Sequence, residues 1–315
     1  MKHFIKLIRY KNLAIIAGVM YILRYGLILP LLTSNGLANQ LTHIQFLLLT
    51  IATVFIAAGG YIINDVYDVD IDKINKPEKL IIGKYIRLRT AENIYVGLTL
   101  IAIICGAYVS YTVNLRSLSL LFPIVAGLLY FYSTSYKSTV LLGNVAIAAI
   151  TALVPFMVII FELPLLTIKY ASFTGSSFNF NFIIAWIAFY SAFAFISTLL
   201  REILKDMEDF EGDEAYGKKT IPITWGIKIS KYITLSLSLL LLCLEIFILI
   251  KYLHDLFSVI YIIPFVITPT IFVMVKILSS KTKEQYHLAS KWCKITMATG
   301  ILYIIFVRVL ILGLY

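Results

Sequence analysis

Charged residues and cysteine are both scarce in this chain of 315 residues. Only 14% of the residues are charged, against about 25% in soluble domains, and the mean hydropathy is +0.91. This composition excludes an ordinary soluble globular protein. The three cysteines lie far apart, in or beside apolar segments, which excludes a disulfide framework and a C-x-x-C metal site. The four histidines fall near the ends of apolar segments without metal-ligand spacing, so we assign them no chemistry.

Long apolar runs make up most of the sequence instead. Each is close to the roughly 20 residues that a helix needs to cross a bilayer. The runs predict nine helices at about residues 12–33, 43–64, 90–112, 117–133, 140–162, 181–204, 230–251, 256–279 and 292–313. We therefore expect an all-α, polytopic membrane protein that forms a nine-helix bundle within membrane lipid, with residues 1–315 as a single domain.

Basic residues divide unevenly between the two sets of connecting segments. If the N-terminus is cytoplasmic, 22 lysines and arginines fall inside and 3 outside, while Arg24 and Arg308 lie within spans. This asymmetry predicts a cytoplasmic N-terminus and an odd number of helices in the plasma or inner membrane. The membrane topology also explains the net charge of +10, so we expect no nucleic-acid partner. Arg24 is expected either to face a polar cavity or to snorkel towards the interface.

Acidic residues are few but concentrated. Of 17 in the chain, 12 fall in two short windows. In the first window, Asn64, Asp65, Asp68 and Asp72 read N-D-x-x-D-x-x-x-D. Steps of three and four residues return to one face of a helix, so these aspartates are expected to share a stripe from which Asp70 points away. In the second window, the same spacing recurs in Asp206, Asp209 and Asp213.

Three carboxylates on one stripe repel one another unless a cation lies among them, and oxygen-only ligands favour Mg²⁺. The predicted topology places both motifs at cytoplasmic helix ends, facing each other across an apolar bundle. That arrangement suits a diphosphate attached to a long hydrocarbon tail. Mg²⁺ would stabilise the departing diphosphate, and the apolar surroundings would shelter an allylic carbocation from water. The simpler alternative is that each acidic cluster is an ordinary solvated helix end.

Together the two motifs and the nine helices resemble the UbiA-type intramembrane prenyltransferases. The resemblance extends to Arg9-Tyr-Lys-Asn12, to Gly83, to Lys137 and to Gly143-Asn144, and so covers most of the chain. It implies transfer of a prenyl group from a polyprenyl diphosphate to a lipid or aromatic acceptor. The chain departs from the family pattern in the loop between the second and third expected helices. There the family commonly has Arg-Pro and then Ser or Ala before the glycine, whereas this chain reads Lys79-Leu-Ile-Ile-Gly83.

The resemblance also implies roles for individual residues. Catalytic and metal-binding roles fall to the motif aspartates Asp65, Asp68, Asp72, Asp206, Asp209 and Asp213. Substrate-binding roles fall to Asn64, Lys137, Asn12, Arg9, Lys205, Tyr132 and Asn144. Among these, Tyr132, Lys137 and Asn144 belong to the short connection before the fifth helix, where a lysine beside aromatic hydroxyls is a plausible phosphate contact.

The run from Arg201 to Asp213 looks most like the archaeal-type geranylgeranylglycerol-phosphate geranylgeranyltransferases, whose donor is geranylgeranyl diphosphate and whose acceptor is geranylgeranylglyceryl phosphate. Extra basic residues would suit a phosphate-bearing acceptor, and these are Lys73, Lys76, Lys205 and Lys218. The runner-up is an enzyme that prenylates an aromatic quinone precursor, because that branch shares the Glu-Gly-Asp portion of the motif. A cation-coupled transporter is a more distant alternative, since it would place acids in mid-span. A noncatalytic scaffold would be favoured by loss of a motif aspartate, yet all six are present.

Overall fold

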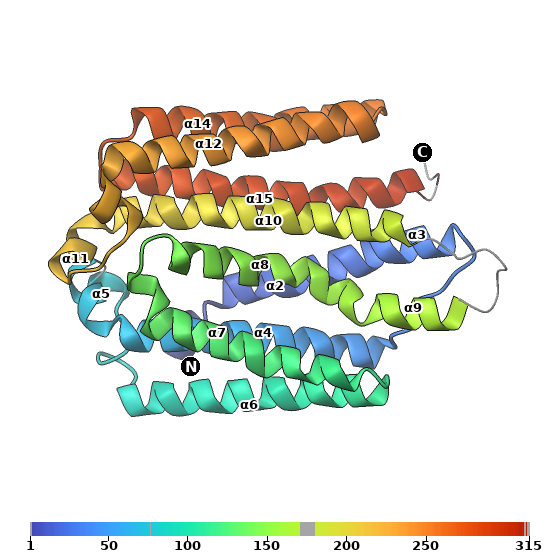
Figure 1. Ribbon diagram of the computed structural model, residues 1–315, viewed down its shortest axis with the longest axis horizontal. Helices are drawn as coiled ribbons and strands as arrows, with labels where there is room; N and C mark the ends of the chain where they lie inside the picture. The colour runs from blue at the N-terminus through green and yellow to red at the C-terminus, as the bar shows by residue number, and fades with distance from the viewer. Residues whose placement is uncertain (1, 76, 171–179, 312, 314–315) are drawn as a thin grey trace. The chain divides into compact units, whose positions relative to one another are not determined.

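The computed structural model describes residues 2–75, 77–170, 180–311 and 313. The helices of the first part of the chain are α1 (Lys2–Leu7), α2 (Tyr10–Ile22), the π-helix η1 (Leu23–Ile28), α3 (Leu29–Thr33), α4 (His43–Tyr67), α5 (Val69–Asn75), α6 (Leu88–Thr112), α7 (Leu121–Thr134), α8 (Leu142–Ile160) and α9 (Glu162–Tyr170). The later helices are α10 (Asn181–Glu208), α11 (Phe210–Ala215), α12 (Ile221–Tyr252), α13 (Leu256–Ile262), the π-helix η5 (Ile263–Ile267), α14 (Thr268–Ser279) and α15 (Lys283–Ile311). Short 3₁₀ turns are η2 (Pro77–Lys79), η3 (Arg116–Leu120) and η4 (Tyr136–Ser138). Figure 1 shows these helices in chain order.

Nine helical stretches within the described residues are long and apolar enough to cross a membrane, which confirms the expected fold class. Four of them extend well beyond the bounds that hydropathy indicates, and one of these is the ninth, which begins at Lys283. The fifth continues through α8 and α9 to Tyr170, the sixth continues to Glu208, and the seventh begins at Ile221. Inside that seventh stretch Gly226 adopts φ 86° and ψ 156°, a conformation essentially restricted to glycine, so α12 is broken there.

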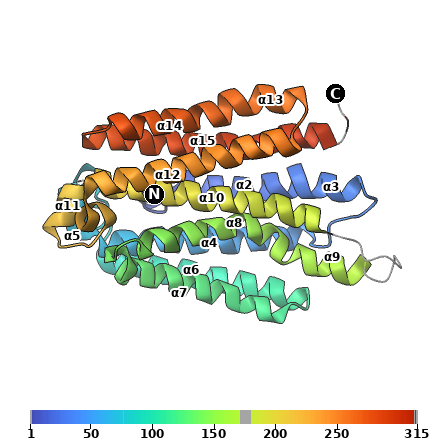
Figure 2. The ribbon, with the colours of Figure 1, turned by 45° about the horizontal axis from the view of Figure 1, so that its top comes forward.

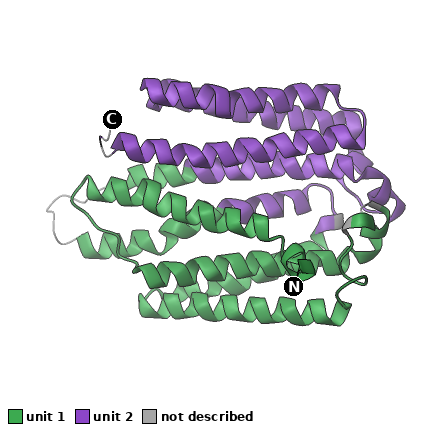
Figure 3. Ribbon diagram, turned by 180° about the vertical axis from the view of Figure 1, so that it is seen from behind, with its two compact units in different colours: residues 1–136, 153–188 green, residues 137–152, 189–315 purple. Residues whose placement is uncertain are grey.

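The chain divides into two compact units, which Figure 3 colours separately. Unit 1 comprises residues 1–136 and 153–188, and unit 2 comprises residues 137–152 and 189–315. The boundaries therefore pass through α8 and α10. Each unit contains one of the two acidic motifs, and each is described by itself below.

In unit 1, α6 and α7 pack beside α4 (Figure 2). Small residues allow this close approach: a Cβ added at Gly106 of α6 would lie 2.2 Å from the ring of Phe122 at the start of α7. Glycine at such contacts is typical of helix packing inside membranes, where backbones approach closely.

The buried Arg24 also belongs to unit 1. Its surroundings test whether it faces a polar cavity or snorkels towards the interface. Its Nη1 atom lies 3.2 Å from Oε2 of Glu162, and both side chains are almost fully buried. Its Nη2 donates to the carbonyl of Leu41 at 2.5 Å, and its guanidinium lies 4.3 Å from the ring centroid of Phe46. Glu162 also accepts from the backbone N–H groups of Gln40 and Leu41. Arg24 therefore neither snorkels nor faces a cavity alone, because it is held in an ion pair.

In unit 2, α14 packs against both α12 and α15. One face of α12 buries Ser230, Thr234, Ser238 and Glu245. Glu245 accepts a hydrogen bond from Thr270 of α14 at 2.9 Å, while its other carboxyl oxygen is buried without a hydrogen-bond partner in the described part of the chain. Polar contacts of this kind join helices inside membranes.

Candidate functional site

The first acidic motif lies where α4 ends and α5 begins, in unit 1. Asp68 occupies the junction with φ −94° and ψ 1°, the sparsely allowed bridge region of backbone conformation. The hydrogen-bond ladder continues across it, because the Asp68 N–H donates to the carbonyl of Asn64 at 3.0 Å and the Asp72 N–H donates to that of Asp68 at 2.8 Å. The expected straight helical stripe therefore bends at its middle aspartate.

Side chains around the first motif are connected by short polar contacts. Asn64 donates to Oδ2 of Asp68 at 2.9 Å, and Asp68 is 6% exposed. The Nη2 atom of Arg9 lies 2.5 Å from Oδ1 of Asp65, and the Arg9 guanidinium is 4.9 Å from the ring centroid of Tyr61. Arg9 itself has φ 52°, a left-handed conformation at the start of α2. The structure thus brings together Arg9, Asn64, Asp65 and Asp68.

Asp70 lies apart from this group, as the spacing predicts. Its side chain is 71% exposed and pairs with Lys73 across one helical turn, with an N–O distance of 2.6 Å. Exposed pairs of this type contribute little stability. Asp70 therefore serves as a natural reference for the motif carboxylates that surround it in sequence.

The second acidic motif, in unit 2, repeats the backbone arrangement of the first. Helix α10 ends at Glu208, Asp209 adopts φ −95° and ψ 13°, and α11 begins at Phe210. The Asp209 N–H donates to the carbonyl of Lys205 at 2.8 Å, and the Asp213 N–H donates to that of Asp209 at 3.0 Å. Two segments about 140 residues apart thus share one spacing and one bend.

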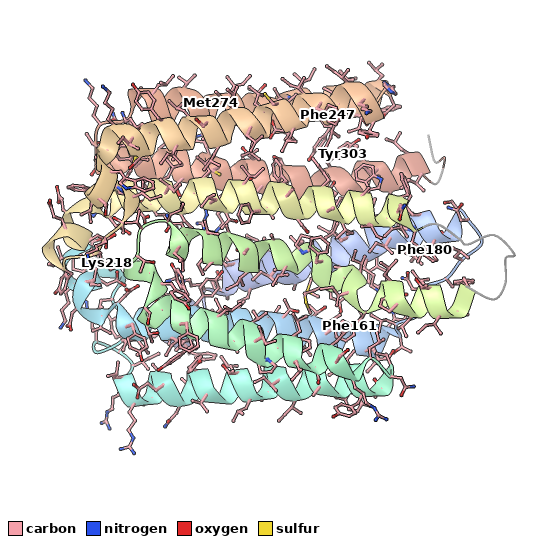
Figure 4. All side chains as sticks on the ribbon, viewed as in Figure 1. Phe161, Phe180, Lys218, Phe247, Met274 and Tyr303 are labelled. Carbon is pink, nitrogen blue, oxygen red and sulfur yellow. The ribbon has the colours of Figure 1, made fainter. Side chains whose placement is uncertain are left out.

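The second motif gathers polar side chains from three further segments of unit 2. Asn144 of α8 donates to Oδ2 of Asp206 at 2.7 Å, and Lys218 lies 3.2 Å from Oδ1 of Asp213. Lys137 of η4 is close enough to Asp213 to act on it electrostatically. Burial raises the pKa of Asp213 above its ordinary value, while Lys218 acts in the opposite direction. Figure 4 labels Lys218 at the link between α11 and α12.

Glu202, one turn before Asp206, joins two cations. Its Oε1 atom lies 2.9 Å from Nη2 of Arg201 and 2.7 Å from Nζ of Lys205. Lys137 is again near enough to act on Glu202, and Glu202 and Lys205 both act on Asp206. The second motif therefore lies within a mixed group of carboxylates and cations.

Residues 27–295 match the model of the UbiA prenyltransferase family. The chain belongs to this family. A digeranylgeranylglyceryl phosphate synthase of Saccharolobus solfataricus is 32% identical over 96% of this chain and 95% of its own. The corresponding enzyme of Methanobrevibacter smithii is 34% identical over 81% of this chain and 83% of its own.

Solved UbiA structures share the fold. One concerned with digeranylgeranylglyceryl phosphate synthase has a TM-score of 0.60 at 26% identity, covering 96% of this chain and 98% of the other. A UbiA homologue from Archaeoglobus fulgidus, bound to GPP and Mg²⁺, has a TM-score of 0.57 at 15% identity, covering 96% of this chain and 99% of the other. At 15% identity this likeness concerns the fold alone.

The donor set of this UbiA family member fits Mg²⁺ chemically, since carboxylate and amide oxygens surround both motifs. No three His, Cys, Asp or Glu side chains within the described ranges converge closely enough to hold a metal by themselves. Mg²⁺ typically binds to one or two carboxylates together with substrate phosphates rather than in an all-protein cage. The residues therefore fit a metal that is bound jointly with a diphosphate, and assigning it to the six aspartates remains a prediction.

The expected substrate contacts stay predictions as well, Asn12 and Tyr132 among them. Asn12 lies one turn after the start of α2, where its N–H donates to the carbonyl of Arg9 at 2.8 Å. Tyr132 is half-buried on α7 in unit 1, whereas Lys137 and Asn144 belong to unit 2.

Sequence reasoning missed the partners of three charged groups in the UbiA fold. Arg24 and Glu162 each place a charge within an apolar segment, but nothing in the sequence pattern pairs residues 138 positions apart. Glu202 belongs to the acidic window of the second motif. Its spacing of three residues from Lys205 was the signal that could have identified the ion pair.

Proposed function

We propose that this protein transfers a geranylgeranyl group from geranylgeranyl diphosphate to geranylgeranylglyceryl phosphate, with Mg²⁺ as cofactor. The observation that carries the acceptor assignment is the similarity over 96% of the chain to a digeranylgeranylglyceryl phosphate synthase. The Mg²⁺ and prenyl diphosphate found with the Archaeoglobus fulgidus homologue support the donor and the cofactor.

In each unit the motif aspartates would hold Mg²⁺ together with diphosphate oxygens of the donor, and the metal would neutralise the charge that develops on the departing diphosphate. Lys137 adds a positive charge beside the second motif, and Asn144 holds the Asp206 carboxylate by donating to it. Asn64 holds the Asp68 carboxylate in the same way. These amide contacts orient the carboxylates before substrate binds, which limits the reorganisation needed during reaction.

Loss of diphosphate leaves an allylic carbocation on the donor, which the acceptor's glycerol hydroxyl attacks while its proton is released. Apolar side chains of the spans exclude water from the carbocation. Arg9 and Asn12 lie at the start of α2 as candidate contacts at the polar entrance. Lys205 and Lys218 lie beside the second motif, whereas Lys73 is exposed and paired with Asp70. Lys76 lies outside the described residues.

The positive-inside asymmetry supports a cytoplasmic N-terminus in the plasma membrane. Both motifs then end helices on the cytoplasmic side, where water-soluble Mg²⁺ is available. The single family match from residue 27 to 295 spans both compact units, which supports one functional domain.

Parallel transfer assays test this function. Purified protein in liposomes with Mg²⁺ and radiolabelled geranylgeranyl diphosphate is given either geranylgeranylglyceryl phosphate or 1,4-dihydroxy-2-naphthoate, and the products are separated by chromatography. We expect label to move to the glycerol lipid, EDTA to stop the transfer and added Mg²⁺ to restore it. Transfer only to the aromatic acceptor would place the protein in the quinone branch instead.

A further inference from the structure

Arg201, Glu202 and Lys205 form an ion-paired cluster beside the second acidic motif. The proposed metal binding gives this cluster no role. Glu202 is the most covered member, with 13% of its side chain exposed, while Arg201 is 25% exposed and Lys205 is 31% exposed. The carboxylate therefore lies behind the two cations. Both cations bond to the same oxygen, Oε1, which fixes their positions relative to each other.

Arg201 retains unused hydrogen-bonding capacity. Its guanidinium carries five N–H donors in a planar fork. Its one hydrogen bond to the described residues runs from Nη2 to Glu202. A charged residue within a span is costly to maintain unless it serves a site or a partner. With a quarter of its side chain exposed, Arg201 can present its remaining donors to a ligand.

The charge of the cluster specifies the kind of ligand. Arg201, Lys205 and the nearby Lys137 are three cations, and Glu202 is one anion, which leaves a net charge of +2. Asp206 is outside this group because we assign it to the metal. A phosphomonoester carries about −1.5 to −2 at neutral pH, whereas an aromatic carboxylate carries a single charge. Arginine also matches phosphate oxygens with two parallel hydrogen bonds.

We infer that Arg201 and Lys205, held by Glu202, form the subsite for the phosphomonoester of the lipid acceptor. Arg201 binds the phosphate directly, and Glu202 is a positioning residue that keeps both cations in place. This inference rests on the proposed function, since it names the part of the acceptor that the protein recognises. Arg201 lies about one and a half helical turns before Asp206 along α10, so the phosphate is bound close to the second acidic motif.

Binding without donor tests the subsite separately from catalysis. Radiolabelled geranylgeranylglyceryl phosphate and its dephosphorylated alcohol are titrated against purified wild-type protein and Arg201→Gln. We expect Arg201→Gln to weaken binding of the phosphate form about 10- to 100-fold, the range for one charge-assisted contact, and to leave the alcohol unchanged. Arg201→Lys should recover part of the loss, because it restores the charge without the planar fork.

The matched control is Arg89→Gln, which removes an exposed arginine at the start of α6. It should bind both ligands as the wild type does. Equal weakening of both ligands by Arg201→Gln would show a purely structural role, and unchanged binding of the phosphate form would exclude the contact. Either result overturns the inference.

Steady-state kinetics of the transfer reaction distinguish an effect on acceptor binding from an effect on donor binding. Glu202→Gln should raise the KM for geranylgeranylglyceryl phosphate about tenfold and leave the KM for the donor unchanged. The control is Glu211→Gln, which removes an exposed carboxylate on α11 and should change neither KM. A raised donor KM would assign the cluster to the diphosphate and overturn the inference, as would tighter acceptor binding. If the wild-type protein transfers label to neither acceptor, the proposed function fails, whereas the binding comparison still decides the subsite.

Discussion

At the residue scale, the central feature is the pair of aspartates at the helix junctions. Asp68 and Asp209 have nearly the same backbone angles, and each ends one helix while its carbonyl accepts the first hydrogen bond of the next. A residue in this position projects its side chain at a corner rather than along a helix face. The repetition of the corner in both motifs indicates that the bend, and not only the spacing, belongs to the site.

Replacing either corner aspartate by asparagine tests the carboxylate with little change of shape. In Asp68→Asn the side-chain oxygen can still accept from Asn64, so the fold should be retained, while the charge that would face Mg²⁺ is lost. We expect Asp68→Asn and Asp209→Asn each to lower kcat by about 100-fold or more, the scale for losing one preorganised stabilising group. The measurement is the transfer assay at saturating donor.

Asp70→Asn is the matched control within the first motif. It removes the same charge at an exposed position that pairs with Lys73 across one turn. Its kcat should stay within about twofold of wild type, since exposed pairs contribute under about 1 kcal/mol. Full activity in a folded Asp68→Asn or Asp209→Asn protein would refute the metal assignment for that residue.

At the element scale, one ion pair connects three parts of unit 1. Arg24 belongs to the π-helix η1, Glu162 begins α9, and both bond to the backbone of the segment between α3 and α4. A π-helical turn is rare and often marks a functional site within a helix. Two buried charges with no other compensation would be costly, so the pair must form as a unit.

Removing one partner should therefore destabilise the protein strongly. We expect Arg24→Met to lower the free energy of unfolding by about 3–5 kcal/mol, because it leaves the Glu162 carboxylate buried without its cation. The double variant Arg24→Met/Glu162→Leu should recover most of that loss. Thermal unfolding in detergent measures both, with Asp70→Asn as an exposed-pair reference that changes stability by under about 1 kcal/mol. Equal stability of Arg24→Met and wild type would contradict the buried pair.

Hydropathy predicts which segments cross the membrane, but not where the helices end or which side chains pair between them. The nine spans follow from apolar runs of the required length, and the two aspartate motifs follow from spacing. The continuation of α10 through Lys205 and Asp206 to Glu208 carries no hydropathic signal, because its stability comes from polar contacts that form only in the folded chain. For the same reason the bends at Asp68 and Asp209 could not be predicted from a pattern that a straight helix satisfies equally well.

At the scale of the whole molecule, both compact units show the same arrangement of acidic and basic residues. Each compact unit carries one acidic motif at a junction between a long helix and a short one, and basic residues accompany both motifs. Basic residues near a membrane surface are retained on the cytoplasmic side. If the positive-inside rule governs this chain, both motifs face the cytoplasm whatever the arrangement of the two units.

Cysteine labelling in intact cells tests that orientation directly. In a background without Cys105, Cys243 and Cys293, single cysteines replace Lys219, next to the second motif, or Arg116, on a predicted outside segment; both positions are exposed. A membrane-impermeant maleimide should label Arg116→Cys in intact cells, but label Lys219→Cys only after permeabilisation. Labelling of Lys219→Cys in intact cells would reverse the topology. The second motif would then lie outside the cell, and its donor would have to be supplied from there.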